Sequence, residues 1–189
     1  MTSDQPFIRE MNAHDFSAVL RFADEQIGTN YFSEKKLKNI FNASTKDDLC
    51  ASFVLVDQDG IQAIRLSFPP NQWIERPAAQ PVNPHMWKVS VDEVAYFQSL
   101  FVAKKYQAQG WGIKLSEASI DNLRKMGSKA VICHSWNESP GNSSRKYLDR
   151  LGFQAVISMP DYWKSIDYEC TRCGKPPCVC SATEMVLYL

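Results

Sequence analysis

The sequence has no hydrophobic run approaching the ~20 apolar residues that a membrane-spanning helix needs. Residues 1–6 have neither the basic start nor the apolar centre of a secretory signal. Internal repeats and low-complexity tracts are absent as well, which excludes repeat architectures and biased linker segments. We therefore expect a globular protein with a cytoplasmic location and no membrane partner.

The chain also lacks an excess of charge of either sign, since 21 lysines and arginines balance 21 aspartates and glutamates. A dedicated nucleic-acid-binding protein is usually basic, so we expect no nucleic-acid partner. The distribution is uneven: residues 1–103 hold nine basic and thirteen acidic residues, whereas residues 104–150 hold nine and four. The basic excess of the second segment suits a polyanionic ligand, although it would also suit an ordinary solvated face.

The composition that is present is typical of an ordered domain, with 44% hydrophobic and 12% aromatic residues. The length suits one domain with a sizeable core, and we expect that domain to cover residues 1–189. The early strands are hairpin partners around the turn Asp57–Gly60, and the later strands alternate with helices. The pattern predicts an α/β fold, with a central mixed β-sheet flanked by helices on both faces. The expected strands are 7–11, 51–56, 61–68, 93–103, 129–136, 153–158 and 184–189, and the expected helices are 12–28, 33–41, 110–126 and 143–151.

A long irregular stretch, residues 69–92, interrupts this pattern with five prolines and the aromatic residues Trp73 and Trp87. Loops of this length are unusual inside a compact domain and often have a function. Two interpretations remain open, a substrate lid and a packed insertion whose aromatic side chains form small satellite cores.

A glycine-containing turn follows the strand expected at 93–103 and leads into the helix expected at 110–126. Its residues are Gln107, Ala108, Gln109, Gly110, Trp111 and Gly112. Glycine lets backbone N–H groups approach an anion, and the positive end of the helix dipole adds attraction. The spacing is neither that of a P-loop, which ends in Gly-Lys-Ser/Thr, nor the G-x-G-x-x-G of dinucleotide-binding folds. We therefore predict a phosphate-binding turn of another type.

The pattern Gln-x-x-Gly-x-Gly after a strand ending in Leu100-Phe101-Val102 resembles the acetyl-coenzyme A signature of the GNAT acetyltransferases. A second match, from Asn142 to Leu151-Gly152-Phe153, is similar to the helix-Leu-Gly-Phe element of that family. The resemblance covers roughly residues 7–157 in the order of elements. It implies a GNAT-like fold in which the strands at 93–103 and 129–136 part to form a V-shaped cleft, with acetyl-coenzyme A as cosubstrate.

The same resemblance implies which residues contact coenzyme A. Backbone N–H groups of a bulged strand at Leu100, Phe101 and Val102 would bind the thioester carbonyl and the pantetheine amides. The N–H groups of residues 107–112 would hold the pyrophosphate. Asn137 and Asn142 match positions that often contact the coenzyme, although they would also be ordinary loop and cap residues.

The catalytic groups are harder to name. Glu93 and Asp92 begin the strand on which many family members carry a carboxylate base, but both would also be ordinary solvated acids. His134 is an alternative base or a structural histidine. Many family members carry a general-acid tyrosine where this chain has Leu148, whereas Tyr147 lies one residue earlier, about 100° around the helix. Tyr147 is therefore either a re-aimed acid or a packing residue, and in the second case the thiolate leaves without a tyrosine.

Four cysteines, Cys170, Cys173, Cys178 and Cys180, lie within residues 170–180 with the spacing C-x2-C-x4-C-x-C. The first half, Cys-x-x-Cys-Gly-Lys, resembles a zinc knuckle. Four thiolates suit tetrahedral Zn(II), and metal binding is favoured over disulfides in a cytosolic chain. We predict one structural zinc in this insertion, with disulfides, free thiols or a redox role as alternatives. Cys50 and Cys133 lie in apolar strands and are predicted core residues.

These observations predict an N-acetyltransferase that moves an acetyl group from acetyl-coenzyme A to a primary amine of a small molecule or peptide. Because no convincing nucleophile–base pair is present, we expect direct attack without an acyl-enzyme intermediate. One alternative is a non-catalytic acyl-coenzyme A-binding protein of the same fold, in which Leu148 marks lost chemistry. Another is a cysteine-loop docking module for a protein or nucleic acid, although the loop holds few positive charges. The sequence leaves open the acceptor and the choice between monomer and homodimer.

Overall fold

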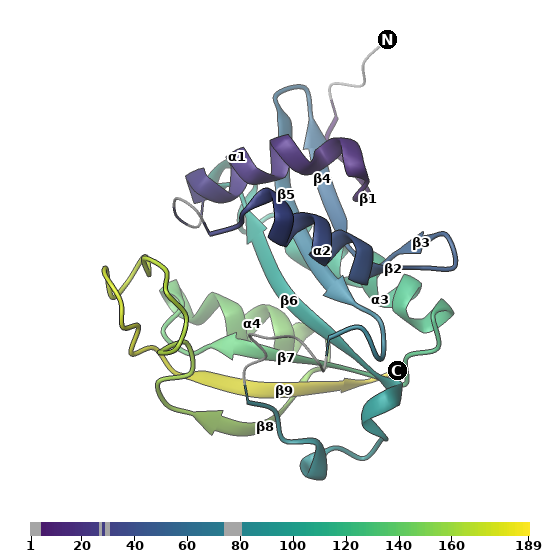
Figure 1. The fold of residues 1–189 in the computed structure, drawn as a ribbon, viewed down its shortest axis with the longest axis vertical. Coiled ribbons are helices and arrows are strands. Elements are labelled where there is room, and N and C mark those ends of the chain that lie inside the picture. The colour runs from purple at the N-terminus through teal and green to yellow at the C-terminus, as the bar shows by residue number, and fades with distance from the viewer. Residues whose placement is uncertain (1–4, 27, 29–30, 74–80) are drawn as a thin grey trace.

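The computed structural model describes residues 5–26, 28, 31–73 and 81–189. Seven strands form one mixed sheet in the order β1-β4-β5-β6-β7-β9-β8 (Figure 1). A separate hairpin of β2 (Thr45–Lys46) and β3 (Leu49–Cys50) was not expected from the sequence. The strands of the main sheet are β1 Phe7–Glu10, β4 Phe53–Asp57, β5 Gly60–Phe68, β6 Val94–Val102, β7 Ala130–Trp136, β8 Gln154–Met159 and β9 Ala182–Tyr188.

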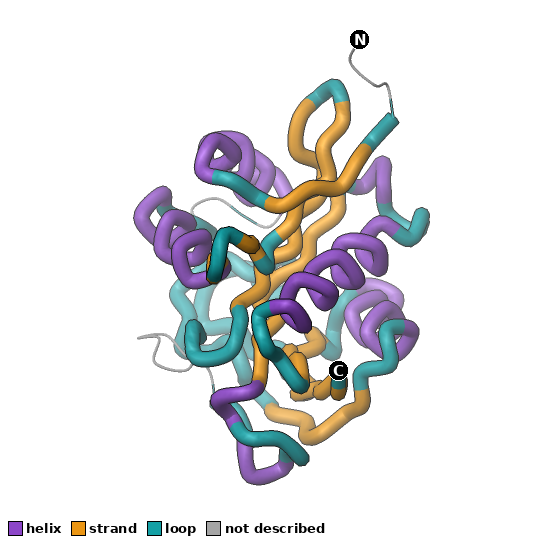
Figure 2. Tube along the Cα trace, turned by 90° about the vertical axis from the view of Figure 1, so that its right-hand side faces the viewer, coloured by secondary structure: helices purple, strands orange, loops and turns teal. Residues whose placement is uncertain are grey.

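Helices cover both faces of the sheet, as Figure 2 shows, and the described part of the chain holds four α-helices. They are α1 Phe16–Gln26, α2 Glu34–Ser44, α3 Trp111–Lys125 and α4 Ser143–Arg150. Helices α1 and α2 pack into one apolar cluster, while α3 and α4 pack into clusters on the opposite face. The α/β fold with a mixed sheet between two helical layers, predicted from the sequence, is confirmed.

The sheet is divided between β6 and β7, which form its one parallel pair among the described strands. Their pairing runs only from Val94 opposite Ala130 to Phe97 opposite Cys133. Beyond these positions β6 pairs with β5 and β7 with β9, so the two strands diverge (Figure 1). The register of β6 against β5 shifts at the same point, where β6 carries one extra residue, Gln98. The bulge and the V-shaped split agree with the geometry that the sequence resemblance implied.

The stretch 69–92 is in part a packed insertion. Trp73 and Trp87 are buried, and their indole N–H groups donate to Val94 O (2.8 Å) and Glu184 Oε1 (2.9 Å). Residues 74–80, which belong to the lid interpretation, lie outside the described residues. None of the helices in the described part of the chain is both long and apolar enough to cross a membrane.

Candidate functional site

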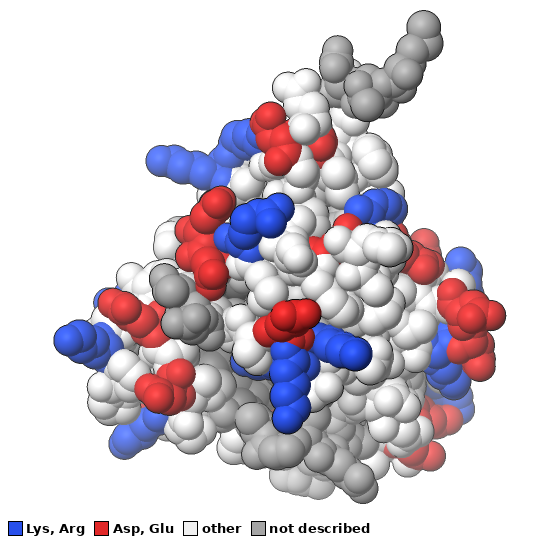
Figure 3. All heavy atoms as spheres, turned by 45° about the horizontal axis from the view of Figure 1, so that its top comes forward, with Lys and Arg blue, Asp and Glu red and all other residues white. Residues whose placement is uncertain are grey.

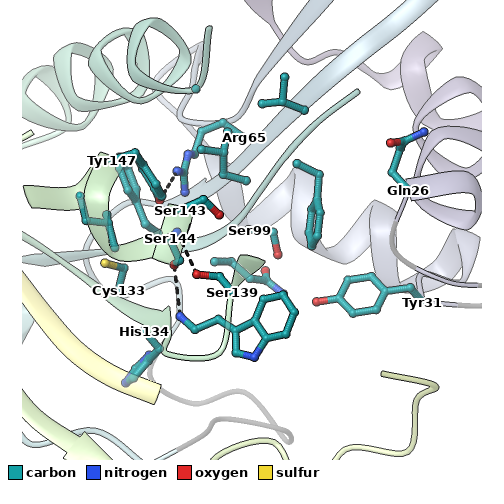
Figure 4. A pocket seen from close by; sticks show the side chains of 18 of the residues that line it. Gln26, Tyr31, Arg65, Ser99, Cys133, His134, Ser139, Ser143, Ser144 and Tyr147 are labelled. Carbon is teal, nitrogen blue, oxygen red and sulfur yellow. Dashed lines mark hydrogen bonds between the residues drawn. The ribbon is translucent and has the colours of Figure 1, made fainter. Parts of the chain in front are cut away.

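A cavity of about 1740 Å³ opens at the split between β6 and β7. Its walls come from α2, β5, β6, the turn before α3, β7, α4 and the segment 162–171. Figure 4 shows Arg65 and Tyr147 together on one side of this space and Tyr31 and Gln26 on another. The cavity is larger than the 300–1,000 Å³ typical of sites for small ligands, and therefore has room for two reactants.

The turn at residues 108–112 presents a row of unused backbone donors. Among the described residues, no acceptor is bonded to the N–H groups of these five residues, whereas the N–H of Gln107 donates to Lys104 O at 3.3 Å. Ala108 (φ 59°) and Gly110 (φ 83°) both adopt the left-handed conformation, which turns successive N–H groups toward one side. Residues 107–110 are exposed, so an anion can reach this N-terminus of α3.

The open edge of β6 continues this row of donors. Ala103 N–H donates to Gln62 O on the β5 side at 2.8 Å. Because consecutive N–H groups of a strand point to opposite edges, those of Leu100 and Val102 point toward the split, and that of Phe101 toward β5. The Gln107 side chain donates to Val102 O at 2.9 Å and so ties the turn to the strand. A Cβ on Gly112 would lie 3.1 Å from Leu100 Cδ2, which explains why glycine suits this close approach of helix and strand.

The two asparagines expected to contact coenzyme A do not line the cavity. Asn137 instead links two segments, since its side chain donates to Ser181 Oγ at 3.0 Å and accepts from Thr183 Oγ1 at 2.8 Å. Asn142 has a left-handed backbone (φ 56°) and precedes α4. The structure therefore gives both residues places in the scaffold, and their predicted contacts with the coenzyme stay predictions.

The charge lining the cavity is mainly positive. The basic lining residues are Lys35, Lys36, Arg65, Lys146 and Arg150, and Asp167 is the one carboxylate among the described lining residues. On the protein face in Figure 3, in contrast, basic and acidic side chains are interspersed. The cavity thus suits an anionic ligand better than the face in Figure 3 does.

Three polar residues behind the split form a chain of contacts. The Tyr96 hydroxyl lies 3.2 Å from His134 Nδ1, and His134 Nε2 lies 3.4 Å from Glu184 Oε2. The side chains of His134 and Glu184 are 3% and 0% exposed. Burial lowers the pKa of His134 despite the opposing effect of Glu184. Burial acts to raise the pKa of Glu184, but nearby His134 and the hydrogen bonds donated by Trp87 Nε1 and the Asn83 N–H outweigh it and lower that pKa.

This arrangement favours a neutral imidazole beside an ionised carboxylate. When its hydrogen is on Nε2, the imidazole accepts a hydrogen bond from the Tyr96 hydroxyl at Nδ1. Tyr162 stacks on the His134 ring at 4.4 Å between centroids, which fixes the ring plane. Tyr96, His134 and Tyr162 all line the cavity. The chain of contacts can therefore take a proton from the cavity, because Glu184 offsets the charge that His134 would gain.

Glu93, the carboxylate predicted as the base, is not brought to this site. It precedes β6 at the end of the strand opposite to the turn at 108–112, and it does not line the cavity. Its side chain forms an ion pair with Lys129. The sequence pattern offered His134 as an alternative base, but it did not indicate Tyr96 or Glu184.

Tyr147, the predicted acid, does line the cavity, whereas Leu148 is 1% exposed and packs in the core. The Tyr147 hydroxyl accepts a hydrogen bond from Arg65 Nη2 at 2.9 Å, drawn in Figure 4. Burial raises the pKa of Tyr147, and the positive charge of Arg65 opposes this effect. Tyr147 thus remains a neutral proton donor at neutral pH.

The four clustered cysteines lie close enough to share one metal ion. Their sulfur atoms all lie within 4.8 Å of one another, with Cys173–Cys180 at 3.4 Å and Cys170–Cys180 at 4.0 Å. Tetrahedral zinc with ~2.3 Å bonds separates its sulfur ligands by about 3.8 Å, whereas a disulfide needs about 2.05 Å. Trp136, Trp163 and Tyr168 pack around the cluster, which also borders the cavity through Cys170. The predicted core cysteines, Cys50 and Cys133, are both buried.

Neither a family model nor a curated protein matches the chain by sequence. Solved structures do match it over almost its whole length. The NatC complex bound to Gag peptide and CoA gives a TM-score of 0.69 at 13% identity, covering 98% of this chain and 99% of that one. The ribosomal-protein-S18-alanine N-acetyltransferase from Escherichia coli gives 0.63 at 18%, covering 97% and 94%.

A third match names the fold directly. A GCN5-related N-acetyltransferase (GNAT) from Kribbella flavida gives a TM-score of 0.64 at 19% identity, covering 97% of this chain and 98% of that one. Likeness at such low identity establishes the fold alone. The chain has the fold of the GNAT N-acetyltransferases.

Proposed function

We propose that this protein is an acetyl-coenzyme A-dependent N-acetyltransferase that acts on a primary amine. The observation that carries the proposal is the row of unused N–H groups at residues 108–112, at the mouth of a divided sheet. Five donors at a helix N-terminus, with the left-handed residues Ala108 and Gly110 among them, suit a pyrophosphate. The N–H groups of Leu100 and Val102 suit the pantetheine amides and the thioester carbonyl that would follow along β6.

We assign one side of the split to coenzyme A and the other side to the amine. Coenzyme A would lie on the side of α3 and α4, where Tyr147 and the basic residues of α4 border the cavity. The amine would enter from the side of α2 and the segment 162–171, whose lining is rich in aromatic residues, among them Tyr31, Trp163 and Tyr168. This lining suits an amine attached to an apolar or peptide group. The peptide bound to the similar NatC structure supports a peptide acceptor, and a small-molecule amine is the other candidate.

The amine must be uncharged before it attacks the thioester. We assign Tyr96 as the group that accepts the amine proton, directly or through one water. The Tyr96 hydroxyl proton passes at the same time to His134 Nδ1. Glu184 then balances the imidazolium. The amine nitrogen forms the C–N bond directly, and the C–S bond breaks with its electron pair remaining on sulfur. The second N–H proton leaves to solvent as the neutral amide forms.

The conservative change Tyr96→Phe tests this function, because it removes one hydroxyl and keeps the ring that stacks on Trp73. We expect kcat to fall about 100-fold, in the range of general-base loss, with unchanged affinity for acetyl-coenzyme A. Tyr188→Phe, on β9 outside the cavity, is the matched control. Release of coenzyme A would be followed across panels of amines and short peptides. Full activity in Tyr96→Phe would refute the assigned base.

A non-catalytic acyl-coenzyme A-binding protein remains the rival function, and buried Leu148 is the observation in its favour. It predicts tight binding of acetyl-coenzyme A with no turnover of any amine in the same panels. Turnover that depends on Tyr96 would exclude it.

We also propose that Cys170, Cys173, Cys178 and Cys180 hold one structural zinc ion. The sulfur separations support four thiolate ligands around a single ion. Four protein ligands leave no open coordination position, so the ion would stabilise the segment rather than react. Its binding energy would replace the apolar contacts that a proline- and cysteine-rich segment lacks.

A further inference from the structure

Arg65 is a buried cation with no carboxylate partner in the described part of the chain. It lies in the middle of β5 and is 1% exposed. Its Nη2 donates to Ser116 Oγ at 3.1 Å and to the Tyr147 hydroxyl at 2.9 Å, and its guanidinium carbon lies 4.2 Å from the centre of the Phe97 ring. Its Nε is buried and has no hydrogen-bond partner among the described residues.

No ion pair of the described residues includes Arg65. Buried charges in proteins are normally paired, because removing an ion from water is unfavourable and neutral hydrogen bonds restore only part of the loss. A well-packed apolar residue of the same size would serve stability at least as well. Stability alone therefore does not account for an arginine at this position.

The position of Arg65 points to the reacting end of coenzyme A. Arg65 lines the cavity and pairs across the sheet with Leu100, on the open stretch of β6. Phe97 and Cys133, the last paired residues before the strands diverge, lie on the same side of the sheet. Figure 4 shows Arg65 directed at Tyr147, with Cys133 on the same side of the cavity.

Arg65 also fixes the orientation of the Tyr147 hydroxyl. The Tyr147 oxygen accepts from Arg65, and its own O–H has no acceptor among the described residues. The hydrogen is therefore available to a ligand atom in the cavity. The charged and titratable groups that act on Tyr147 are Arg65 from β5 and Cys133 from β7, while α3 contributes the neutral Ser116. Burial raises the pKa of the Cys133 thiol to about 12, so this group stays neutral.

We propose that Arg65 is a positioning residue that aims Tyr147 at the sulfur of coenzyme A, and that the pair stabilises the leaving thiolate. The inference rests on the proposed acetyl transfer and adds the leaving-group side to it. When the C–S bond breaks, sulfur keeps the electron pair, and the resulting thiolate accepts a hydrogen bond from the Tyr147 O–H while Arg65 offsets its negative charge. The thiolate takes a proton from solvent when the product leaves. Tyr147 thus assists the leaving group from a different position on α4 than the one expected, where this chain has Leu148.

The test compares two ligands that differ only in the thiol, namely coenzyme A and desulfo-coenzyme A. Calorimetry from neutral to alkaline pH gives the ratio of their affinities. In the wild type we expect the ratio to rise with pH, with a midpoint below that of the free thiol, because the site favours the thiolate. In Arg65→Met we expect the increase of this affinity ratio between neutral and alkaline pH to be about tenfold smaller, which corresponds to one unit of thiol pKa. Tyr147→Phe should weaken it as well.

Two results would overturn the inference. One is an unchanged ratio profile in Arg65→Met. The other is an equal loss of affinity for both ligands, which would place Arg65 on the phosphates. Because neither measurement needs an amine, the comparison decides the role of Arg65 even if no acceptor is turned over and the proposed function fails.

Activity and stability provide a second check where an acceptor is found. We expect Arg65→Met to lower kcat about tenfold or more with little change in KM for acetyl-coenzyme A, and Arg65→Lys to restore part of the loss. The midpoint of thermal unfolding should stay the same or rise in Arg65→Met, because an unpaired buried charge is removed. A lower midpoint with kcat and KM affected together would mean that Arg65 is structural, which would contradict the proposal.

Discussion

The two sides of the split between β6 and β7 are built from different groups. The turn at residues 108–112 uses backbone N–H groups of one continuous segment. The proton-accepting side uses side chains from β6, β7 and β9. A backbone site needs only the right local conformation, so a short pattern can indicate it. A side-chain site depends on which strands become neighbours, which no short pattern records.

The largest effect should come from a substitution in the turn at residues 108–112. Gly110→Asp places a Cβ at φ 83° and a negative charge at the proposed pyrophosphate site. We expect affinity for acetyl-coenzyme A to fall at least about 100-fold, measured by calorimetry. Gly60→Asp is the matched control, because Gly60 also has a positive φ (110°), offers open space for a Cβ and lies outside the cavity. Equal affinities in the two variants would contradict the assignment of the turn.

Loss of the metal should weaken binding of the amine substrate and leave coenzyme A binding intact. Cys173→Ser should remove about one zinc per chain and loosen the segment that carries Tyr168 and Cys170, which line the cavity. We expect KM for the amine to rise about tenfold, in line with a lost acceptor wall, while affinity for coenzyme A stays within about twofold. Metal analysis and binding assays measure both.

Cys50→Ser controls for the loss of a buried thiol outside the cluster. The zinc assignment fails if the purified protein contains no metal and mass spectrometry finds two disulfides in residues 170–180. A parallel loss of coenzyme A binding in Cys173→Ser would instead show that the two sides of the split are not independent.

A smaller effect concerns pH. Burial lowers the pKa of His134, so the neutral base persists below the ordinary histidine value of about 6.5. We expect the acid limb of kcat/KM to lie below that pH. Glu184→Gln should move the limb lower still and reduce kcat, because the imidazolium loses its counter-charge. Glu117→Gln, exposed on α3, is the control. If the acid limb does not move in Glu184→Gln, Glu184 does not affect the titration of the base.

The smallest effect is expected at the carboxylate that the sequence favoured. Glu93 is paired with Lys129 away from the cavity. Glu93→Gln should therefore leave kcat within about twofold of the wild type across the pH range, as a surface substitution would. A loss of tenfold or more in a folded variant would return Glu93 to the reaction and weaken the case for His134.

Apart from the β2–β3 hairpin, the described strands and α-helices were predictable because their signals are local. The periodic apolar residues of α3 and the turn at Asp57–Gly60 each predict one element without knowledge of the rest. Asn122 shows the limit of this reasoning, since it lies outside the apolar pattern of α3 yet is buried through bonds to Glu10 and Cys50 O. Its partners are 112 and 72 residues away in the sequence.

The same limit explains the missed site residues. Glu184 reaches His134 only because β9 inserts between β7 and β8. Arg65 did leave a signal, a single charge in the otherwise uncharged stretch 61–68, although its partners come from α3 and α4. An isolated charge in an apolar strand is a signal that sequence reasoning can use.

The short ladder between β6 and β7 has a consequence for engineering. It joins two portions of the chain, residues 5–126 and 128–189, through four paired positions, and the exposed Gly127 lies between the portions. One portion carries the turn at 108–112, Arg65 and Tyr96, and the other carries His134, Tyr147 and the cysteine cluster. A cut at Gly127 would thus divide the site between two fragments. In a split reporter made from such fragments, the coenzyme-binding cavity would exist only when both fragments are assembled.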